Sequence, residues 1–90
     1  MICKYQELTR LEMEQVDREN TIVLIPLGAL EQHGNQAPLG TDTLIATAMC
    51  DYIEKELKDE DINLLLFPVI PVGLSTEHKE FCGSITFKPM

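Results

Sequence analysis

The sequence has few basic residues, and their scarcity narrows the range of partners. Seven lysines and arginines stand against fifteen aspartates and glutamates in 90 residues, which gives a formal net charge of −8 at pH 7. Binding to nucleic acid depends on clustered basic side chains that displace counterions from phosphates, and no basic stripe is present. We therefore expect no nucleic-acid partner. Much of the acid lies in EKELKDED, residues 54–61, which is typical of the solvated end of a helix.

Paired cysteines and long apolar segments are also missing. The three cysteines, Cys3, Cys50 and Cys82, are far apart and lack C-x-x-C spacing, so they indicate neither a disulfide framework nor a zinc knuckle. The start, MICKYQELTR, has no apolar signal core. The longest uncharged stretch, residues 62–76, is too short and too interrupted by proline to span a bilayer. We expect a soluble cytoplasmic protein that has no contact with a membrane.

The remaining composition is that of one globular unit or part of one. The chain is 44% hydrophobic and 24% charged, which is ordinary for a folded domain. A chain of this size buries only about 60 to 65% of its unfolded surface, so a free-standing fold is expected to be marginally stable. Reliance on partner subunits would follow from that limit.

Two helices are predicted from capping and periodicity. Thr9 and Glu12 form a T-x-x-E capping box at the start of a short helix that is expected to end near Asn20. A longer amphipathic helix is predicted to begin near Asp42 or Thr43. Its expected packing face consists of Leu44, Ile45, Ala48, Met49, Tyr52, Ile53 and Leu57.

Two apolar runs predict parallel strands on either side of this long helix. Residues 21–28, TIVLIPLG, suit a strand covered on both faces, with Pro26 near its end or at a sheet edge. Residues 62–70, INLLLFPVI, predict a second buried strand, and the span between the runs can hold a right-handed helical crossover. Sites in such α/β sheets form beyond the carboxyl ends of the strands, where the polar loops 28–42 and 71–84 are expected.

The first polar loop contains a candidate metal-ligand set. Glu31 and His33 are two residues apart, which on an extended backbone sends both side chains to the same side. Glycines and a proline then allow the loop to turn and bring Asp42 back to them. One imidazole with two carboxylates suits zinc, manganese or iron. The alternative is structural: Asp42 caps the helix, Glu31 is exposed and His33 is a hydrogen-bonded loop residue.

The second polar loop has weaker signals. Ser75 and His78 can be imagined as a nucleophile and its base, but no nucleophile-elbow sequence surrounds Ser75, which favours a turn role. Glu77 and His78 can handle protons or support a metal site from behind its ligands. Ordinary surface polarity explains them equally well.

Two long motifs resemble one known family. Residues 25–43, IPLGALEQHGNQAPLGTDT, closely resemble a signature of the creatininase family of metal-dependent amidohydrolases, in which the segment reads roughly P-x-G-S-x-E-Q-H-G-P-H-L-P-L-x-T-D. Residues 72–87, VGLSTEHKEFCGSITF, resemble its second signature, G-x-S-x-E-H-x-x-F-P-G-T. Two motifs in the right order are far more specific than the spacing of single ligands. The resemblance extends from the first helix through residue 87.

The resemblance implies an α/β fold, a three-layer sandwich with a mostly parallel central sheet. Residues 1–90 would form the amino-terminal part of one such domain, supplying a helix and a strand-helix-strand unit. The implied cofactor is a pair of divalent ions, zinc or manganese, and the implied assembly is a homo-oligomer, commonly a hexamer. The implied substrate is a small-molecule amide or small peptide, whose carbon–nitrogen bond is hydrolysed by a metal-bound hydroxide.

The resemblance also suggests residue roles. Glu31 would bind one metal, His33 the other, and Asp42 would bridge the two. Glu77 and His78 are the catalytic candidates, and Ser75 is the substrate-binding candidate. The chain departs from the family signatures at four positions, which bear on substrate identity more than on metal binding: Asn35, Gln36, Cys82 and Ser84.

Length leaves two hypotheses open. Members of the family continue well beyond 90 residues, and a further histidine and glutamate ligand belong to that later region. One hypothesis is an amidohydrolase of the creatininase type. The other is a non-catalytic α/β fragment or oligomerisation module that keeps the signature loops without a complete site.

Overall fold

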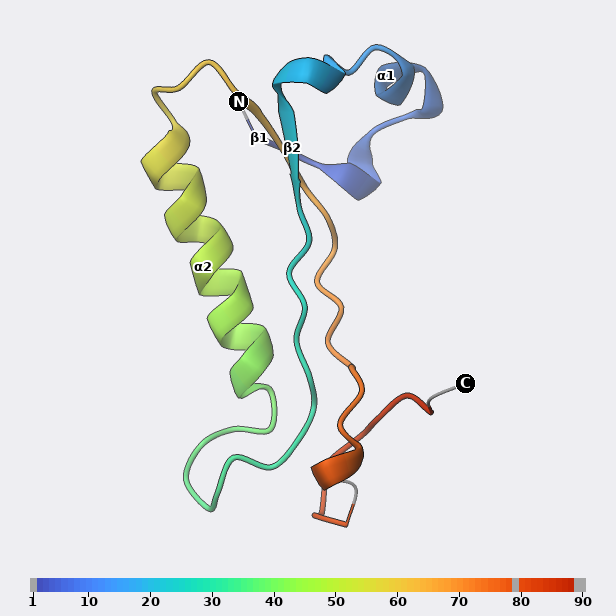
Figure 1. Cartoon of the computed structure of the whole chain (residues 1–90), viewed down its shortest axis with the longest axis vertical. Coiled ribbons are helices and arrows are strands. Elements are labelled where there is room, and N and C mark those ends of the chain that lie inside the picture. Colours follow the sequence, from blue (N-terminus) through green and yellow to red (C-terminus); the bar gives the residue numbers. More distant parts are fainter. Residues whose placement is uncertain (1, 79, 89–90) are drawn as a thin grey trace.

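The computed structural model describes residues 2–78 and 80–88, which form a small parallel sheet with a long helix beside it (Figure 1). The strands are β1 (Ile2–Lys4), β2 (Thr21–Leu24) and β3 (Asn63–Leu66). The α-helices are α1 (Arg10–Glu14) and α2 (Thr41–Leu57), and short 3-10 turns cover Tyr5–Glu7, Arg18–Asn20 and Thr76–His78.

The three strands are parallel, in the order β1-β3-β2. Leu65 of β3 pairs with Cys3 of β1 on one side and with Val23 of β2 on the other. The connection from β2 to β3 passes through α2, which confirms the strand-helix-strand unit. β1 is an addition to the sequence prediction, which placed no strand before the first helix. A run of only three residues carries too little periodicity to reveal a strand.

β2 and β3 are shorter than the apolar runs that predicted them. Prolines at positions 26 and 68 have no N–H to donate to a sheet ladder, so regular pairing stops at Leu24 and Leu66. The segments that follow β2 and β3 nevertheless continue side by side. The Ile70 N–H donates to the Pro26 carbonyl at 3.0 Å, and the Gly28 N–H donates to the Ile70 carbonyl at 2.8 Å. This extension carries both segments to the polar loops.

The first helix begins as predicted and ends early. The Thr9 N–H donates to Glu12 Oε1 at 3.0 Å, and the Glu12 N–H donates to Thr9 Oγ1 at 3.1 Å, which completes the capping box. Hydrogen bonding to the carboxylate by the Thr9 backbone N–H, and secondarily by the Thr9 side chain, lowers the pKa of the Glu12 carboxyl. The helix ends at Glu14 rather than near Asn20. Asp17 accepts a hydrogen bond from the Glu19 N–H and starts a separate 3-10 turn, so the helical pattern is interrupted.

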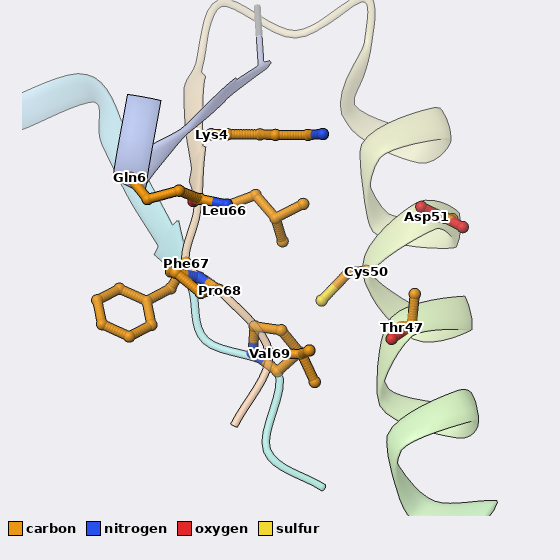
Figure 2. Close-up of a pocket in the computed structure, with 10 residues that line it drawn as sticks. Lys4, Gln6, Thr47, Cys50, Asp51, Leu66, Phe67, Pro68 and Val69 are labelled. Carbon is orange, nitrogen blue, oxygen red and sulfur yellow. The ribbon is translucent and has the colours of Figure 1, made fainter. Parts of the chain in front are cut away.

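Different segments cover the two faces of the sheet, which gives the predicted three layers. Leu65 and Val23 line one pocket together with Met13 of α1. Leu66 lines another pocket together with Cys50 of α2 (Figure 2). The apolar core between the layers is small. The buried hydrophobic residues of the described part of the chain are Ala29, Cys50, Leu64 and Leu65.

The predicted packing face of α2 was wrong in large part. Four of its large apolar residues are exposed: Leu44, Ile45, Met49 and Tyr52. The residues that turn toward the sheet are offset along the helix: Ala46, Cys50, Ile53 and Leu57, of which Cys50 is buried and the others half-buried. These four positions have helical spacing of their own, so α2 carries apolar side chains around much of its circumference. Periodicity alone could not choose between the two faces.

The buried thiol of Cys50 projects from α2 into a pocket of about 180 Å³ between the helix and the chain that follows β3 (Figure 2). Pro68 and Val69 line the opposite wall. Burial, and secondarily the neighbouring Asp51 carboxylate, raise the pKa of the Cys50 thiol, because both disfavour a thiolate. The pocket is mainly apolar and includes none of the predicted metal ligands.

No helix within residues 2–78 and 80–88 has the length and apolar character needed to cross a membrane.

Shortening a buried side chain of the central strand β3 should destabilise the fold far more than shortening an exposed side chain of α1. Leu65 is 5% exposed and Leu11 is 61% exposed. We expect Leu65→Ala to lower the free energy of unfolding by about 2 to 5 kcal/mol, because it removes buried methyl groups and leaves a cavity. Leu11→Ala should change it by no more than ~0.5 kcal/mol. Urea unfolding of the full-length protein measures both, and equal losses would contradict the assignment of the core.

The cysteines should differ in reactivity. Cys50 is buried with a raised thiol pKa, whereas Cys82 is exposed. Since the thiolate is the reactive form, iodoacetamide should modify Cys82 well before Cys50 in the folded protein, and the difference should disappear in denaturant. Peptide mass spectrometry over a time course measures the order. Faster modification of Cys50 in the native protein would contradict the packing of α2 on the sheet.

Candidate metal centre

The first polar loop is held in an extended conformation where the candidate ligands lie. The Ile85 N–H donates to the Leu30 carbonyl at 2.7 Å, and the Glu31 N–H donates to the Leu39 carbonyl at 3.2 Å. His33 forms an isolated antiparallel bridge with Ala37. Strand-like neighbours therefore flank this segment on both sides. Extended backbone places Glu31 and His33 on the same side, as the sequence predicted.

Asp42 reaches the same place from the first turn of α2. The helix begins directly after Gly40, which forms no side-chain cap, so the alternative that Asp42 caps the helix does not hold. Close packing sets the position of the helix start. A Cβ at Gly28 would overlap the Thr43 hydroxyl and lie 2.9 Å from the Thr43 Cα, so only glycine lets α2 begin this near to the end of the strand.

The three predicted ligands converge. His33 Nε2 lies 3.5 Å from Asp42 Oδ2 and 3.7 Å from Glu31 Oε1. One ligand atom from each residue can be chosen so that all three lie within 4.8 Å of one another. The side chains are partly buried, with exposures of 13% for Glu31, 29% for His33 and 36% for Asp42. Partial burial leaves the cluster open to a cation or a substrate.

The imidazole of His33 gives a direct test of whether a metal suits this cluster. Its Nε2 atom is buried and has no hydrogen-bond partner among the described residues. A buried polar atom without a partner costs free energy, and native structures rarely leave one without a reason. A nitrogen lone pair facing two carboxylates is the arrangement that a divalent ion would satisfy. The donor set therefore fits a divalent metal.

The second polar loop packs against the first. His78 Nε2 lies 4.0 Å from Glu31 Oε1, and His78 Nδ1 lies 3.1 Å from Gln32 Nε2. The Gln32 N–H donates to Ser84 Oγ at 2.9 Å. Both histidines of the chain therefore lie at the same carboxyl edge of the sheet, as expected for loops that follow neighbouring parallel strands.

The other two predicted residues of the second loop are less directly placed. Ser75 is 2% exposed, and its N–H donates to Thr86 Oγ1 at 2.6 Å. Glu77 belongs to the 3-10 turn Thr76–His78, but its side chain lies outside the described part of the structure. The roles assigned to Ser75, Glu77 and His78 stay predictions.

Sequence reasoning missed the residues that join the loops. Gln32 bonds to Ser84 and His78 across the two loops, whereas Thr86 bonds to Ser75 within the second segment, and Gln32, Ser84 and Thr86 were not singled out for a role in the site. A signal for Gln32 was present, since a residue between two co-ligands on extended backbone points away from them and toward neighbouring chain. Ser84 was noted only as a departure from the family signature. Its hydroxyl accepts the Gln32 N–H, as a threonine hydroxyl also could.

The parallel sheet and the cluster at its carboxyl edge define an α/β protein with a candidate site for a divalent metal. The sequence profile of the family described as "Creatininase: Creatinine amidohydrolase" matches residues 6–90. The chain belongs to the creatininase family.

Individual relatives and solved structures agree with this assignment. The chain is 39% identical, over 85 residues, to a mycofactocin precursor peptide peptidase of Mycobacterium tuberculosis, covering 89% of this chain and 34% of that protein. It is 33% identical to a creatinine amidohydrolase of Pseudomonas putida, covering 87% and 28%. A structure described as "Creatininase Mn" superposes with a TM-score of 0.72 at 26% identity, covering 94% of this chain and 34% of the other.

A structure of a mutant creatininase gives a TM-score of 0.70 at 28% identity, covering 93% of this chain and 33% of the other. The likeness to both structures confirms the predicted α/β fold class. The chain spans about a third of the length of these relatives.

The contact between Gly28 and Thr43 predicts a specific sensitivity. Gly28→Ala should displace the start of α2 and with it Asp42, lowering the free energy of unfolding by about 1 to 3 kcal/mol and weakening Mn²⁺ binding. Gly40→Ser is the matched control, because its Cβ would meet nothing within 4 Å and its hydroxyl can cap α2. Urea unfolding and titration calorimetry on the full-length protein measure both effects. Equal behaviour of the two variants would refute the steric explanation.

Proposed function

We propose that this protein is part of a metal-dependent hydrolase that cleaves a carbon–nitrogen bond in a small amide or small peptide. The observation that carries the proposal is the convergence of Glu31, His33 and Asp42, where the His33 Nε2 atom is buried and has no hydrogen-bond partner among the described residues. Membership of the creatininase family supports the same chemistry, since relatives are named as an amidohydrolase and a peptidase.

Glu31, His33 and Asp42 would hold the metal, with Asp42 as the bridging ligand if two ions bind. A carboxylate–imidazole set suits manganese, zinc or iron, and a solved relative is described with Mn. When bound, the metal would activate water for attack and polarise the substrate carbonyl. The protein's part is to hold the three ligand atoms together before the ion arrives, which limits the reorganisation needed on binding.

The second loop supplies the remaining candidates. His78 is directed at Glu31 from behind the ligand set, so it can fix that carboxylate or exchange a proton with the site. Glu77 stays a candidate proton carrier. Ser75 was proposed to bind substrate, but its 2% exposure means that a substrate could reach it only after the loop moved. Its burial favours the turn role that the sequence also allowed.

The substrate class follows the relatives only in outline. One is named for creatinine and others for a precursor peptide, and these share a carbon–nitrogen bond next to a carbonyl group. We propose a cyclic amide or a small peptide for this protein. A cytoplasmic homo-oligomer of the hexameric type stays part of the proposal.

A second candidate function is a non-catalytic α/β module that needs other chain to complete it. Large apolar side chains are exposed over α2 and β2, including Leu44, Tyr52 and Ile22. Exposed apolar surface of this kind marks places where another protein surface packs. Measuring metal content, amide hydrolysis and sedimentation on the same sample separates a working centre from an assembly module.

Loss of the proposed bridging carboxylate should remove metal and activity together. In the full-length protein, Asp42→Asn keeps the size of the side chain but removes its charge. Mn²⁺ affinity should therefore fall by at least about 100-fold, which is more than the loss typical when a residue that only hydrogen-bonds to a metal ligand is replaced. Asp51→Asn, on the same helix but outside the cluster, is the control. Titration calorimetry and an amide-hydrolysis assay report the two effects. Unchanged affinity in Asp42→Asn would exclude the cluster as the metal centre.

A further inference from the structure

Gln32 links the two polar loops through its backbone and its side chain. Its N–H donates to Ser84 Oγ, and its side-chain amide contacts both Gly34 and His78. It stands between Glu31 and His33 in the sequence, yet it takes no place in the ligand cluster. These bonds place Gln32 where it can govern the histidine that faces Glu31.

The neighbours of Gln32 determine which way its amide points. The backbone N–H of Gly34 lies 2.9 Å from Gln32 Oε1, and an N–H can only donate, so the atom facing it must be the amide oxygen. The amide nitrogen then faces His78 Nδ1 at 3.1 Å. An amide nitrogen has hydrogens and no acceptor lone pair, so Nδ1 must accept the hydrogen bond.

This bond selects one form of the His78 ring. A neutral imidazole carries one proton, and when Nδ1 accepts a hydrogen bond, that proton must be on Nε2. His78 Nε2 is the atom 4.0 Å from Glu31 Oε1. The ring therefore turns an N–H toward the carboxylate. With the opposite tautomer, a nitrogen lone pair would face the negative charge and repel it.

We propose that Gln32 is a positioning residue that fixes the Nε2–H tautomer of His78 and thereby holds the Glu31 carboxylate in its ligand position. The inference rests on the proposed function in one respect, namely that Glu31 binds a metal. The carboxylate is only 13% exposed, so the orientation of the ring beside it matters more than it would in bulk water. Gln32 acts through His78 and touches neither metal nor substrate.

The structure supports a stable link rather than an incidental contact. The backbone N–H of His78 donates to the Ser75 carbonyl at 3.0 Å. The His78 ring lies beside the Phe81 ring, with 6.2 Å between the ring centroids. The backbone N–H of Gln32, on the first loop, donates to Ser84 on the second loop, which also carries His78. Both ends of the amide–imidazole bond are therefore held by the chain, which reduces the entropy lost in forming it.

The tautomer can be read directly in metal-free, full-length protein. Long-range ¹H–¹⁵N correlation spectra at pH ~8, where neutral imidazole is the ordinary form, distinguish a protonated ring nitrogen from an unprotonated one. We expect Nδ1 of His78 to be unprotonated and Nε2 to be protonated. His78→Phe identifies the His78 signals by their loss. A predominantly Nδ1–H ring in the unmodified protein would overturn the proposal.

Two variants of Gln32 test its role. Gln32→Met removes the amide while keeping the side chain's length, and it should leave a mixture of His78 tautomers. Gln32→Glu retains an acceptor for the Gly34 N–H but offers no hydrogen to His78, so Nδ1 should become protonated. The matched control is Gln36→Met, a change at an exposed glutamine of the same loop that should leave the His78 spectrum unaltered.

Metal affinity gives the second readout. Gln32→Met should weaken Mn²⁺ binding about tenfold, the lower end of the range for residues that orient ligands, and Gln36→Met should not. If Gln32 acts through His78, its substitution should have little further effect on Mn²⁺ affinity in a His78→Phe background. A full tenfold loss in that background would show that Gln32 acts by another route.

The two proposals fail in different ways. If the unmodified protein binds no Mn²⁺ while the tautomer shifts as expected, the metal proposal fails and Gln32 still sets the ring. If the protein binds Mn²⁺ but Gln32→Met leaves both the tautomer and the affinity unchanged, the role of Gln32 is refuted and the metal centre stands.

Discussion

The candidate site depends on the parallel pairing of β2 with β3. Because of this pairing, the segments that follow β2 and β3 leave the sheet at the same edge. Hydrogen bonds between Ile70 and residues 26–28 keep these segments together beyond the last paired residues of the strands. The antiparallel bridge between Leu30 and Ile85 then joins the two loops. An antiparallel arrangement would have sent the loops to opposite ends. Every contact between the signature motifs follows from this one constraint.

At the edge where the two loops meet, the ligand cluster contains a polar atom whose hydrogen bonding is not satisfied by any described residue. Two carboxylates face one imidazole whose Nε2 has no hydrogen-bond partner among the described residues, although the surrounding backbone is well bonded. Proteins keep such unsatisfied groups where function requires them. Glu31 and His33 come from extended backbone and Asp42 from a helix start, so their relative positions are fixed by different elements. A site assembled in this way is well suited to hold a cation without rearrangement.

The rest of the described structure exposes much apolar surface. Among the described residues, four hydrophobic side chains form the buried core, while fifteen large hydrophobic residues are exposed. The relatives are about three times as long as the part that this chain matches. With so small a core, α1 must rely heavily on its capping box, and the position of α2 on the close contact of Gly28 with Thr43.

Much of the site was determined by local sequence. The spacing of Glu31 and His33, the capping box at Thr9 and the loop before α2 each follow from rules that act over a few residues, so they could be predicted without coordinates. Local motifs also gave the family, because two signatures in order are rarely accidental. The apolar run at residues 62–70 likewise predicted the strand β3, because it too is a pattern within a few residues.

Tertiary structure alone decided the pairing partners and the orientation of the helix. The strand Ile2–Lys4 exists because β3 offers it an edge, and the face of α2 that packs inward is set by contacts at Thr43 and Cys50 rather than by the stronger apolar stripe. The bond between Gln32 and His78 joins residues 46 positions apart. Contacts of such separation depend on how the whole chain closes, and no short stretch of sequence specifies them.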